Sequence, residues 1–523
     1  MVTSFPTPQG FVYSNFKGIR TRNGINTGGT ISATVCQNID FIPNTVGTDI
    51  QIRSTLGNKL VAQYPDFKII KGFETVQDRD RHCILYIENN LKGMLLEYKF
   101  ESDIFEIIQD DLLVTGQANG ITMNDTAYDV FVFTNGLDYY SVNFATTPIT
   151  QVINPVYQDE RVTGLALAEK DGALVIGQYD GFGLVIGSRQ GDIYDWDYAV
   201  TTDDKTKAWY QLFGKGVTAV VPYIEGLLVF TKDDSTLLTG NPADLSSFTR
   251  NDASIGGCMS FESWLYHDKY LFFYDDTQKN MYYYTQINTG QKILGEPIAT
   301  EVQKYFDKLD RLQMVGYIGD NRSEIWLLSD KFKLVYDYFV GEWSERVCQD
   351  ITSYFVYDND VYSTTPDGKL LLEKASESFG IFDEVFYPSI YSMQTINLGS
   401  YSNMKEMEMQ PLFTVTDNFE NKFWVDCIID GKKTKSKFVK MFSKAGIWGD
   451  DRDLINPPSN QQFDVAKFAS EDDSITHQVK GKFISNWYYL QFTIRTEEKG
   501  QDFNIMAMEL KGITVETDTI GRK

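Results

Sequence analysis

The sequence is poor in histidine and cysteine, the residues on which many metal and nucleophilic sites depend. It holds 3 histidines and 5 cysteines in 523 residues. His82, His267 and His477 lie far apart and outside any HExxH-type pattern, so no zinc motif is visible. The cysteines are scattered, odd in number and without a CxxC pair, which favours packing roles in a reducing compartment over a disulfide framework.

Nucleotide-binding and membrane-spanning signatures are missing as well. There is no GxxxxGK[ST] loop, and the glycines of the run SIGGCM are followed by no helical pattern that could cradle a phosphate. Cys258 in this run has no histidine near it in sequence, so we expect it to pack rather than to attack a substrate. No apolar run approaches the roughly 20 residues of a membrane helix, and the N-terminus lacks the pattern of a secretory signal. We therefore expect a protein that is made and stays in water, with no membrane partner.

Basic residues are also in deficit. The chain has 72 Asp and Glu against 48 Lys and Arg, a formal net charge of −24. A negative field repels phosphate backbones, which argues against tight, sequence-independent binding of DNA or RNA. The acidity can serve solubility alone, or it can let a polyanion slide past a surface without adhering. The sequence leaves both readings open.

Aromatic residues and short apolar runs dominate what is present. The 35 Phe and 31 Tyr favour strands, because aromatic side chains fit half-buried pleated surfaces. Strand cores recur as CILYIE, DVFVFTNG, ALVIGQ, LLVFTK, YLFFYD, EIWLLSD and DVYSTT, which start at residues 83, 129, 173, 227, 270, 324 and 360. Most are followed within about ten residues by a partner strand, across polar turns such as Asp-Gly or Asn-Gly. The pattern predicts a series of hairpins.

The spacing of these cores predicts a β-propeller. Successive cores lie roughly 35–55 residues apart, clustering near 45, which is the period of a four-stranded propeller blade. Such a sheet buries both faces only against its neighbours in a ring. We therefore predict an all-β protein in which residues 81–380 form a propeller of six to seven blades, and in which the stretch Gly164–Ala199 is one repeat unit rather than an active site. An array of β-sandwiches has similar strand spacing and is the alternative.

One helix is predicted within the propeller, near residues 299–312. The sequence ATEVQKYFDKLDRLQ places apolar residues at helical spacing. They are Val302, Tyr305, Phe306, Leu309 and Leu312. We interpret this segment as an amphipathic insertion between blades that lies on the surface of the ring.

The two ends of the chain differ from the middle. Residues 385–518 contain longer strands with cleaner alternation, which predicts a separate C-terminal antiparallel β-sandwich. Residues 1–80 are rich in Gly, Asn and Thr, and we expect an extended N-terminal arm that lies on the propeller or on a neighbouring subunit. Its basic residues Lys17, Arg20 and Arg22 stand out in an acidic chain and are candidates for an inter-subunit contact.

The candidate for chemistry is an acidic cluster in the run DIYDWDY. Asp192, Asp195 and Asp197 could in principle supply the acid and base of a glycosidase. On a strand, however, Asp195 and Asp197 point the same way, whereas a catalytic pair normally comes from different strands. A turn with capping carboxylates is the structural alternative. We predict no catalytic residue, no metal site and no cofactor.

Several stretches, taken in order, resemble a known family. The segment NGINTGGTISATVCQNIDFIP…IQIRSTLGNKL resembles the N-terminal part of phage tail propellers, where an Asn-Val/Ile-Asp motif precedes an arginine-containing strand and a glycine. GDIYDWDYA and the stretch from VTAVVPYIEGLLVF to GGCMSFES resemble the propeller of the same group. These are the DNA-stabilisation, tail-nozzle or tail-hub proteins of short-tailed phages, including crAss-like phages. The resemblance spans roughly residues 20–350 and rests on motif order; the C-terminal region departs most.

The resemblance implies a structural virion protein of the tail, assembled in the host cytoplasm. Its family forms a ring, sixfold by the resemblance, below the portal and adaptor, and retains packaged DNA until ejection. Genomic DNA would pass the channel without specific binding. This expectation is compatible with the acidic charge and the predicted closed β-ring.

Two other functions remain open. A propeller that cleaves or binds host surface glycan predicts a monomer whose central funnel holds carboxylates within roughly 5–10 Å of each other. A soluble scaffold propeller that binds another protein through its faces is the third possibility.

Overall fold

The computed structural model describes most of the chain and divides it into two compact units. The described residues are 9–13, 15–20, 30–43, 49–77, 79–123, 129–144, 148–198, 207–223, 226–241, 248–253, 255–286, 292–319, 322–375, 379–396, 405–407, 412–416, 421–441, 474–478, 484–487 and 489–515. The propeller unit comprises residues 60–333 and 350–373, and the terminal unit comprises residues 1–59, 334–349 and 374–523. Nearly all regular structure is strand, as predicted; the described residues contain one short 3-10 helix.

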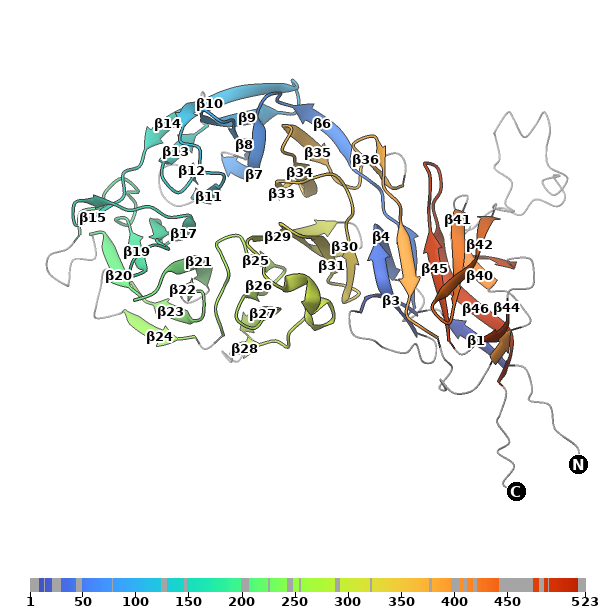
Figure 1. The fold of residues 1–523 in the computed structure, drawn as a ribbon. Helices are drawn as coiled ribbons and strands as arrows, with labels where there is room; N and C mark the ends of the chain where they lie inside the picture. The colour runs from blue at the N-terminus through green and yellow to red at the C-terminus, as the bar shows by residue number, and fades with distance from the viewer. Residues whose placement is uncertain are drawn as a thin grey trace, which may run out of the picture. The chain divides into compact units, whose positions relative to one another are not determined.

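Six four-stranded antiparallel sheets form the blades of the propeller unit (Figure 1). The first blade consists of β7 (Lys68–Gln77), β8 (Asp80–Glu88), β9 (Gly93–Lys99) and β10 (Ile104–Leu112). The second consists of β11 (Asn119–Met123), β12 (Val130–Thr134), β13 (Tyr139–Asn143) and β14 (Ile149–Val152). The third consists of β17 (Ala166–Lys170), β18 (Ala173–Gly177), β19 (Leu184–Gly187) and β20 (Trp209–Leu212). A two-stranded hairpin of β15 (Val156–Tyr157) and β16 (Glu160–Arg161) precedes the third of these sheets.

The remaining three sheets complete the repeat. The fourth consists of β21 (Val217–Tyr223), β22 (Gly226–Thr231), β23 (Ser235–Thr239) and β24 (Thr249–Asp252). The fifth consists of β25 (Trp264–His267), β26 (Tyr270–Asp275), β27 (Asn280–Gln286) and β28 (Lys292–Leu294). The sixth consists of β33 (Ser353–Tyr357), β34 (Asp360–Thr364), β35 (Lys369–Leu372) and β6 (Lys59–Gln63). The hairpin of β29 (Leu312–Gly319) and β30 (Arg322–Ser329) packs between β25 and β33. The prediction of six to seven blades is confirmed.

The first strands of neighbouring blades pack side by side around the axis. Contacts join β7 to β11, β11 to β17, β17 to β21, β25 to β29, β29 to β33 and β33 to β7. Each predicted strand core lies on the second strand of a hairpin in this ring. In β18, for example, all five residues are buried, because both faces of a strand inside a blade are covered by neighbouring blades. The stretch Gly164–Ala199 is accordingly a repeat unit, as predicted.

The ring is closed by the strand that enters it. β6 comes before all other propeller strands in the chain, yet it forms the outer strand of the sheet β33–β35. Next to it, the Tyr64 N–H donates to the Gly368 carbonyl at 2.8 Å. Gly368 has a φ of +80°, and a Cβ there would lie 2.1 Å from the Tyr64 carbonyl oxygen, so glycine is required. The propeller therefore starts near residue 60 instead of residue 81.

The helical segment is shorter and more buried than predicted. A 3-10 helix, η1, spans Thr300–Phe306 and ends where Asp307 becomes extended and Lys308 adopts a φ of 55°. Val302 and Phe306 are fully buried, and Phe306 stacks on Tyr274 with ring centroids 5.1 Å apart. Most of the apolar residues at helical spacing are therefore buried in the propeller, and they do not form the predicted longer helix on the surface of the ring.

The terminal unit is a β structure built from both ends of the chain. From the N-terminal end it contains β1 (Gln9–Tyr13), β2 (Asn15–Ile19), β3 (Thr30–Gln37), β4 (Ile39–Pro43) and β5 (Ile50–Ser54). β31 (Lys333–Asp337), at the division between the units, pairs with β32 (Glu342–Glu345). The C-terminal strands are β36 (Ile381–Phe382), β37 (Val385–Phe386), β38 (Ile390–Met393), β39 (Lys405–Met407), β40 (Leu412–Thr416), β41 (Asn421–Ile429), β42 (Lys432–Met441), β43 (Ser474–Gln478), β44 (Ile484–Trp487), β45 (Leu490–Arg495) and β46 (Asn504–Val515).

The described part of the predicted arm is extended, but it pairs within the chain. β1 is antiparallel to β46, β3 to β38, and β5 to β46. The Gly, Asn and Thr content that suggested an arm therefore belongs to strands completed by residues more than 300 positions away. The C-terminal antiparallel sheet is present, but residues 385–518 share it with the N-terminal strands instead of forming a separate domain.

Candidate functional site

One face of the propeller gathers two kinds of loop. These are the turns between the second and third strand of each blade and the links from one blade to the next. The Leu113 N–H, in the link after β10, donates to the Asp138 carboxylate at 3.1 Å, in the turn after β12. Likewise, Lys215 Nζ, in the link after β20, lies 2.8 Å from Asp234 Oδ2, in the turn after β22. These contacts place turns and links on the same face.

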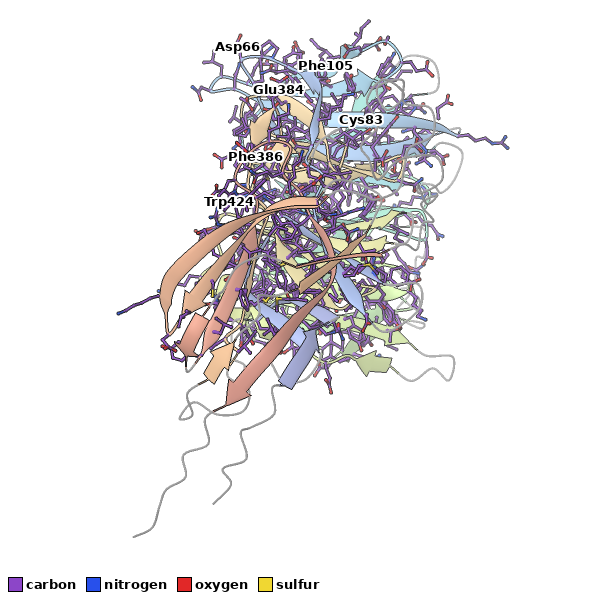
Figure 2. The ribbon with its side chains drawn as sticks, turned by 90° about the vertical axis from the view of Figure 1, so that its right-hand side faces the viewer. Asp66, Cys83, Phe105, Glu384, Phe386 and Trp424 are labelled. Atoms are coloured by element: carbon purple, nitrogen blue, oxygen red, sulfur yellow. The ribbon has the colours of Figure 1, made fainter. Side chains whose placement is uncertain are left out.

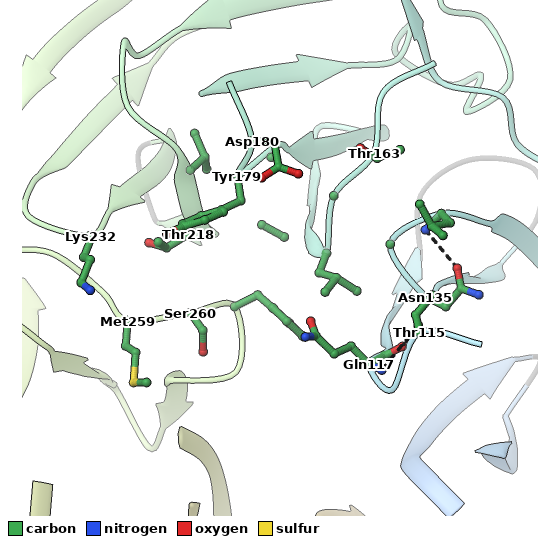
Figure 3. Close-up of a pocket in the computed structure, with 18 of the residues that line it drawn as sticks. Thr115, Gln117, Asn135, Thr163, Tyr179, Asp180, Thr218, Lys232, Met259 and Ser260 are labelled. Carbon is green, nitrogen blue, oxygen red and sulfur yellow. Dashed lines mark hydrogen bonds between the residues drawn. The ribbon is translucent and has the colours of Figure 1, made fainter. Parts of the chain in front are cut away.

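A pocket of about 650 Å³ opens among these loops (Figure 3). It is lined by side chains from four blades and the links between them. Its hydroxyl and amide groups come from Thr115, Gln117, Asn135, Thr163, Thr218 and Ser260, and one aromatic ring comes from Tyr179. The turn that presents Asn135 is rigid, because its side-chain oxygen accepts hydrogen bonds from the N–H groups of Leu137 at 3.0 Å and Asp138 at 2.7 Å. The lining also contains four charged side chains: Asp180, Lys232, Asp276 and Asp310. The pocket is therefore polar, with charged groups among its hydroxyls and amides.

Exposed apolar and charged side chains lie together on the loops of this face. The blades β7–β10, β11–β14 and β17–β20 expose the apolar side chains of Leu91, Leu113, Val114, Leu137 and Phe182 on such loops. The same blades carry charged residues there as well, among them Lys92, Asp138 and Asp180. The loops of the two following blades carry Lys215, Lys232, Asp233, Asp234, Asp276 and Lys279.

A buried ionic cluster lies next to the pocket. Glu262 accepts a hydrogen bond from Lys71 Nζ at 2.7 Å and from Arg311 Nε at 2.8 Å. Phe261, which lines the pocket, packs on the same lysine, with Nζ 5.1 Å from its ring centroid. Arg311 also donates to the Thr352 carbonyl at 2.9 Å. The cluster therefore joins β7 to the residues that precede β25, β29 and β33.

Electrostatics keep Glu262 ionised. Burial by itself raises the pKa of this carboxyl group, but the charges of Lys71 and Arg311 outweigh it and lower the pKa to about 2. A carboxylate held by two cations is poorly suited to proton transfer near neutral pH. We assign the cluster to the stability of the propeller.

One carboxylate of the pocket lining, that of Asp276, is also paired. Asp276 contacts Lys279 Nζ at 2.7 Å and Lys232 Nζ at 3.1 Å. Burial opposes its ionisation, but the two ammonium groups prevail and lower its pKa. Asp180 and Asp310 complete the carboxylates of the lining.

The structure places the acidic cluster of the sequence outside this pocket. The carboxylate of Asp192 accepts from the Tyr194 N–H, and that of Asp195 from the Asp197 N–H, each at 3.0 Å. Asp195 and Asp197 also contact Arg189 and Lys207. Asp192 lines a second pocket of about 470 Å³ formed with β11–β14 residues. Two of the three carboxylates, those of Asp192 and Asp195, thus cap a turn, which is the structural alternative weighed above, and the third pairs with Lys207.

The basic residues of the N-terminal segment contact a carboxylate of their own chain. Lys17 Nζ lies 3.1 Å and Arg20 Nη2 2.8 Å from the carboxylate of Glu342, which is buried within the terminal unit. The N–H of Gly18 donates to the same carboxylate at 2.8 Å. Arg22 lies outside the described residues. Lys17 and Arg20 thus contact a carboxylate within their own unit, and their predicted contact with a neighbouring subunit stays a prediction.

The cysteines and histidines of the propeller lie among packed side chains. Cys258 is fully buried, and burial raises its pKa to about 12, so the thiol stays protonated near neutral pH. His82 stacks on Phe144, with ring centroids 4.1 Å apart, and its Nδ1 lies 2.6 Å from Glu97. The part of the chain that the structure describes contains no group of three or more His, Cys, Asp or Glu able to hold a metal ion.

Sequence reasoning missed both the pocket and the ionic cluster. The pocket is assembled from loops that are spread over residues 115–310, and its polar residues look like ordinary turn residues. Lys71 lay in the segment interpreted as an arm, and Glu262 follows the run singled out for its glycines. The one available signal was Lys71, a lysine within the apolar run FKIIKGF. A buried lysine needs an acidic partner to compensate its charge.

Comparisons with known proteins add little to this geometry. No family model matches the sequence, and no curated protein matches it. Among solved structures, the computationally designed Ika8 protein is similar over 61% of this chain and 99% of that chain, with 13% sequence identity and a TM-score of 0.32. In the described part of the chain, no helix has the length and hydrophobicity needed to cross a bilayer.

Proposed function

We propose that this chain is a structural protein of a phage tail, a nozzle or hub ring through which packaged DNA leaves the particle. The proposal starts from the resemblance given above. Its two groups of motifs fall in different units: residues 23–59 belong to the terminal unit and residues 191–263 to the propeller unit. The resemblance therefore extends over both units and not over a propeller alone.

The observation that carries the proposal is the way the propeller is inserted. Both ends of the chain belong to the terminal unit, and the propeller is formed by the residues between them. Such an insertion gives one chain two independent β surfaces, one for contacts with tail partners such as the portal or adaptor and one that presents the propeller.

The charge supports a conduit role. DNA adheres where Lys and Arg neutralise its phosphates, whereas an acidic wall lets it pass. With a formal charge of −24, a ring of copies is a strongly negative assembly. DNA passing through it would meet repulsion rather than specific contacts.

A second candidate function is the binding of a glycan at the propeller face. The pocket of about 650 Å³ with its hydroxyl, amide and tyrosine lining favours this possibility. Tyr179 is 60% exposed at its edge, where a sugar ring could stack. Cleavage is less well supported, since Asp276 is held by two lysines.

Native mass spectrometry combined with a glycan screen separates the two functions. The structural role predicts a closed homo-oligomer and neither binding nor turnover across bacterial surface polysaccharides. The glycan role predicts a monomer whose binding is lost in Tyr179→Ala and kept in Tyr266→Ala, a matched exposed tyrosine outside the pocket. A monomer that binds or cleaves glycan would overturn the structural proposal.

A further inference from the structure

The pocket of about 650 Å³ on the propeller face contains two carboxylates that lack a cation partner. Asp180 lies on the turn between β18 and β19, and Asp310 lies on the link before β29. Both residues are exposed, and in the described part of the chain neither side chain forms an ion pair or a hydrogen bond. The pocket therefore offers two negative groups that another molecule can neutralise.

The cations around the pocket already have carboxylate partners. Three lysines and three aspartates on the surrounding loops form ion pairs with one another: Lys215, Lys232, Lys279, Asp233, Asp234 and Asp276. The cations of the neighbouring ionic cluster, Lys71 and Arg311, both contact Glu262. Asp180 and Asp310 thus remain for a ligand.

Aromatic and apolar side chains lie beside these carboxylates. Tyr179 lines the pocket directly before Asp180 and is 60% exposed, and Figure 3 shows the two side chains close together. Phe182, on the same turn, is 80% exposed. Leu137, on the turn between β12 and β13, lines the pocket and is 41% exposed. A ring next to a carboxylate suits an ammonium or guanidinium group, because the ring face attracts the cation and the carboxylate pairs with it.

We propose that this pocket binds an extended, basic peptide segment of a partner protein. A lysine or arginine side chain of the segment enters the pocket and pairs with Asp180 or Asp310. Its methylene groups lie against the ring of Tyr179, as the stems of long cationic side chains commonly do on apolar surfaces. An apolar residue beside it on the segment covers Leu137 or Phe182, which are otherwise in contact with water. The inference concerns a single copy of the propeller and does not depend on the ring-forming role.

The size and charge of the site favour a peptide over the other classes of ligand. A small cation such as arginine amide fills only part of a pocket of about 650 Å³ and leaves the exposed side chains of the rim uncovered. A neutral glycan supplies no positive charge for Asp180 and Asp310. The formal charge of −24 on the whole chain also attracts a basic partner.

The test uses the full chain and four labelled pools of nine-residue peptides. The central residue of each pool is fixed as Arg, Lys, Gln or Glu, and the other positions are random. Peptides retained by the immobilised protein are identified by mass spectrometry, and their affinities are measured by fluorescence polarisation at low and at high salt. Arginine amide and a panel of bacterial surface oligosaccharides are the competing probes.

A double variant, Asp180→Asn with Asp310→Asn, removes the two charges and keeps the shape of the side chains. The matched control, Asp66→Asn with Asp159→Asn, changes two exposed carboxylates of the propeller unit that lie outside the pocket. Asp66 is labelled in Figure 2. Circular dichroism melting checks that both double variants are folded.

We expect the Arg and Lys pools to be retained and the Gln and Glu pools to be washed away. The retained peptides should bind the control as tightly as the wild type and the Asp180/Asp310 variant at least tenfold more weakly. Their binding should weaken at high salt, because the contact joins opposite charges near the surface. Arginine amide should bind at least tenfold more weakly than the peptides, because it does not reach the rim.

Several results would overturn the inference. If no pool is retained, if the Gln or Glu pool is retained equally well, or if the Asp180/Asp310 variant binds like the wild type, the pocket does not select a basic segment. If arginine amide binds as tightly as the peptides, the ligand is a small cation. If an oligosaccharide binds and basic peptides do not displace it, the pocket serves the glycan function instead. Native mass spectrometry tests the ring separately from each of these results.

Discussion

Glu262 shows how one side chain holds distant parts of the propeller together. Its carboxylate accepts hydrogen bonds from Lys71, 191 positions earlier, and from Arg311, 49 positions later. Lys71 lies on β7, and Glu262 and Arg311 come just before β25 and β29, so each group belongs to the first strand of a different sheet or hairpin. Removing one member of a buried charge cluster costs more than the cluster itself contributes, because the others are left without compensation.

We predict that Glu262→Gln destabilises the propeller by about 3–5 kcal/mol at neutral pH. The carboxyl pKa is about 2 in the folded protein and lies higher in the unfolded chain. The stabilisation is therefore complete above the unfolded value, about 4.3, and is lost as pH falls towards 2. Differential scanning calorimetry from pH 7 to pH 2.5 should show the gap between wild type and variant closing with acid.

The matched control for this experiment is Glu160→Gln, which removes an exposed carboxylate of the same unit. Its effect should stay within about 0.5 kcal/mol. An equally small effect of Glu262→Gln, or a gap that does not change with pH, would contradict the role assigned to the cluster.

At the level of single elements, the turn between β18 and β19 depends on two different glycines. Gly181 and Gly183 both have positive φ, 73° and 66°. A Cβ on Gly181 would meet nothing within 4 Å, whereas a Cβ on Gly183 would lie 1.5 Å from the Lys215 carbonyl oxygen. Gly181 is needed only for its positive φ. Gly183 is needed for its positive φ and also because the backbone at Lys215, in the link before β21, lies close against it.

Gly181→Ala is expected to cost about 1–2 kcal/mol, which is the penalty of a left-handed alanine. Gly183→Ala should cost roughly 2 kcal/mol more, because the backbone must also move away from the new methyl group. Paired thermal melts of the two variants measure the difference. Equal losses would mean that the close approach to Lys215 does not constrain this turn.

The elements that could be predicted are those buried on both faces. β18 and β22 are buried at every position, and such short apolar runs between turn residues stand out in the sequence. β24 is exposed at all four positions and β10 is bulged, so neither has a hydrophobic period to detect. The number and spacing of the blades were predicted from the inner strands, whereas outer strands such as β10 and β24 have no pattern from which they could be predicted.

The N-terminal boundary and the helix could not be predicted for a different reason. β6 lies beside β35, which comes more than 300 residues later, and Lys71 of β7 bonds Glu262, 191 residues later. One sequence does not reveal such distant partners. The segment after Ala299 has helical spacing, but Leu309 and Leu312 are buried in the link and in β29 instead of in a helix. The pocket was hidden because its polar residues come from many separate loops.

At the scale of the whole molecule, the chain consists of a propeller inserted into a β unit made from both ends. The terminal unit gives the chain a second β surface in addition to the propeller. The proposed tail ring would use that surface for contacts with other tail proteins.

Single-particle electron microscopy of the purified full-length protein tests this account most directly. The account predicts a closed ring of copies whose axial channel has a wall with net negative charge, so that DNA passes without adhering. A particle that is a single propeller, or a ring whose channel wall is predominantly basic, would contradict it.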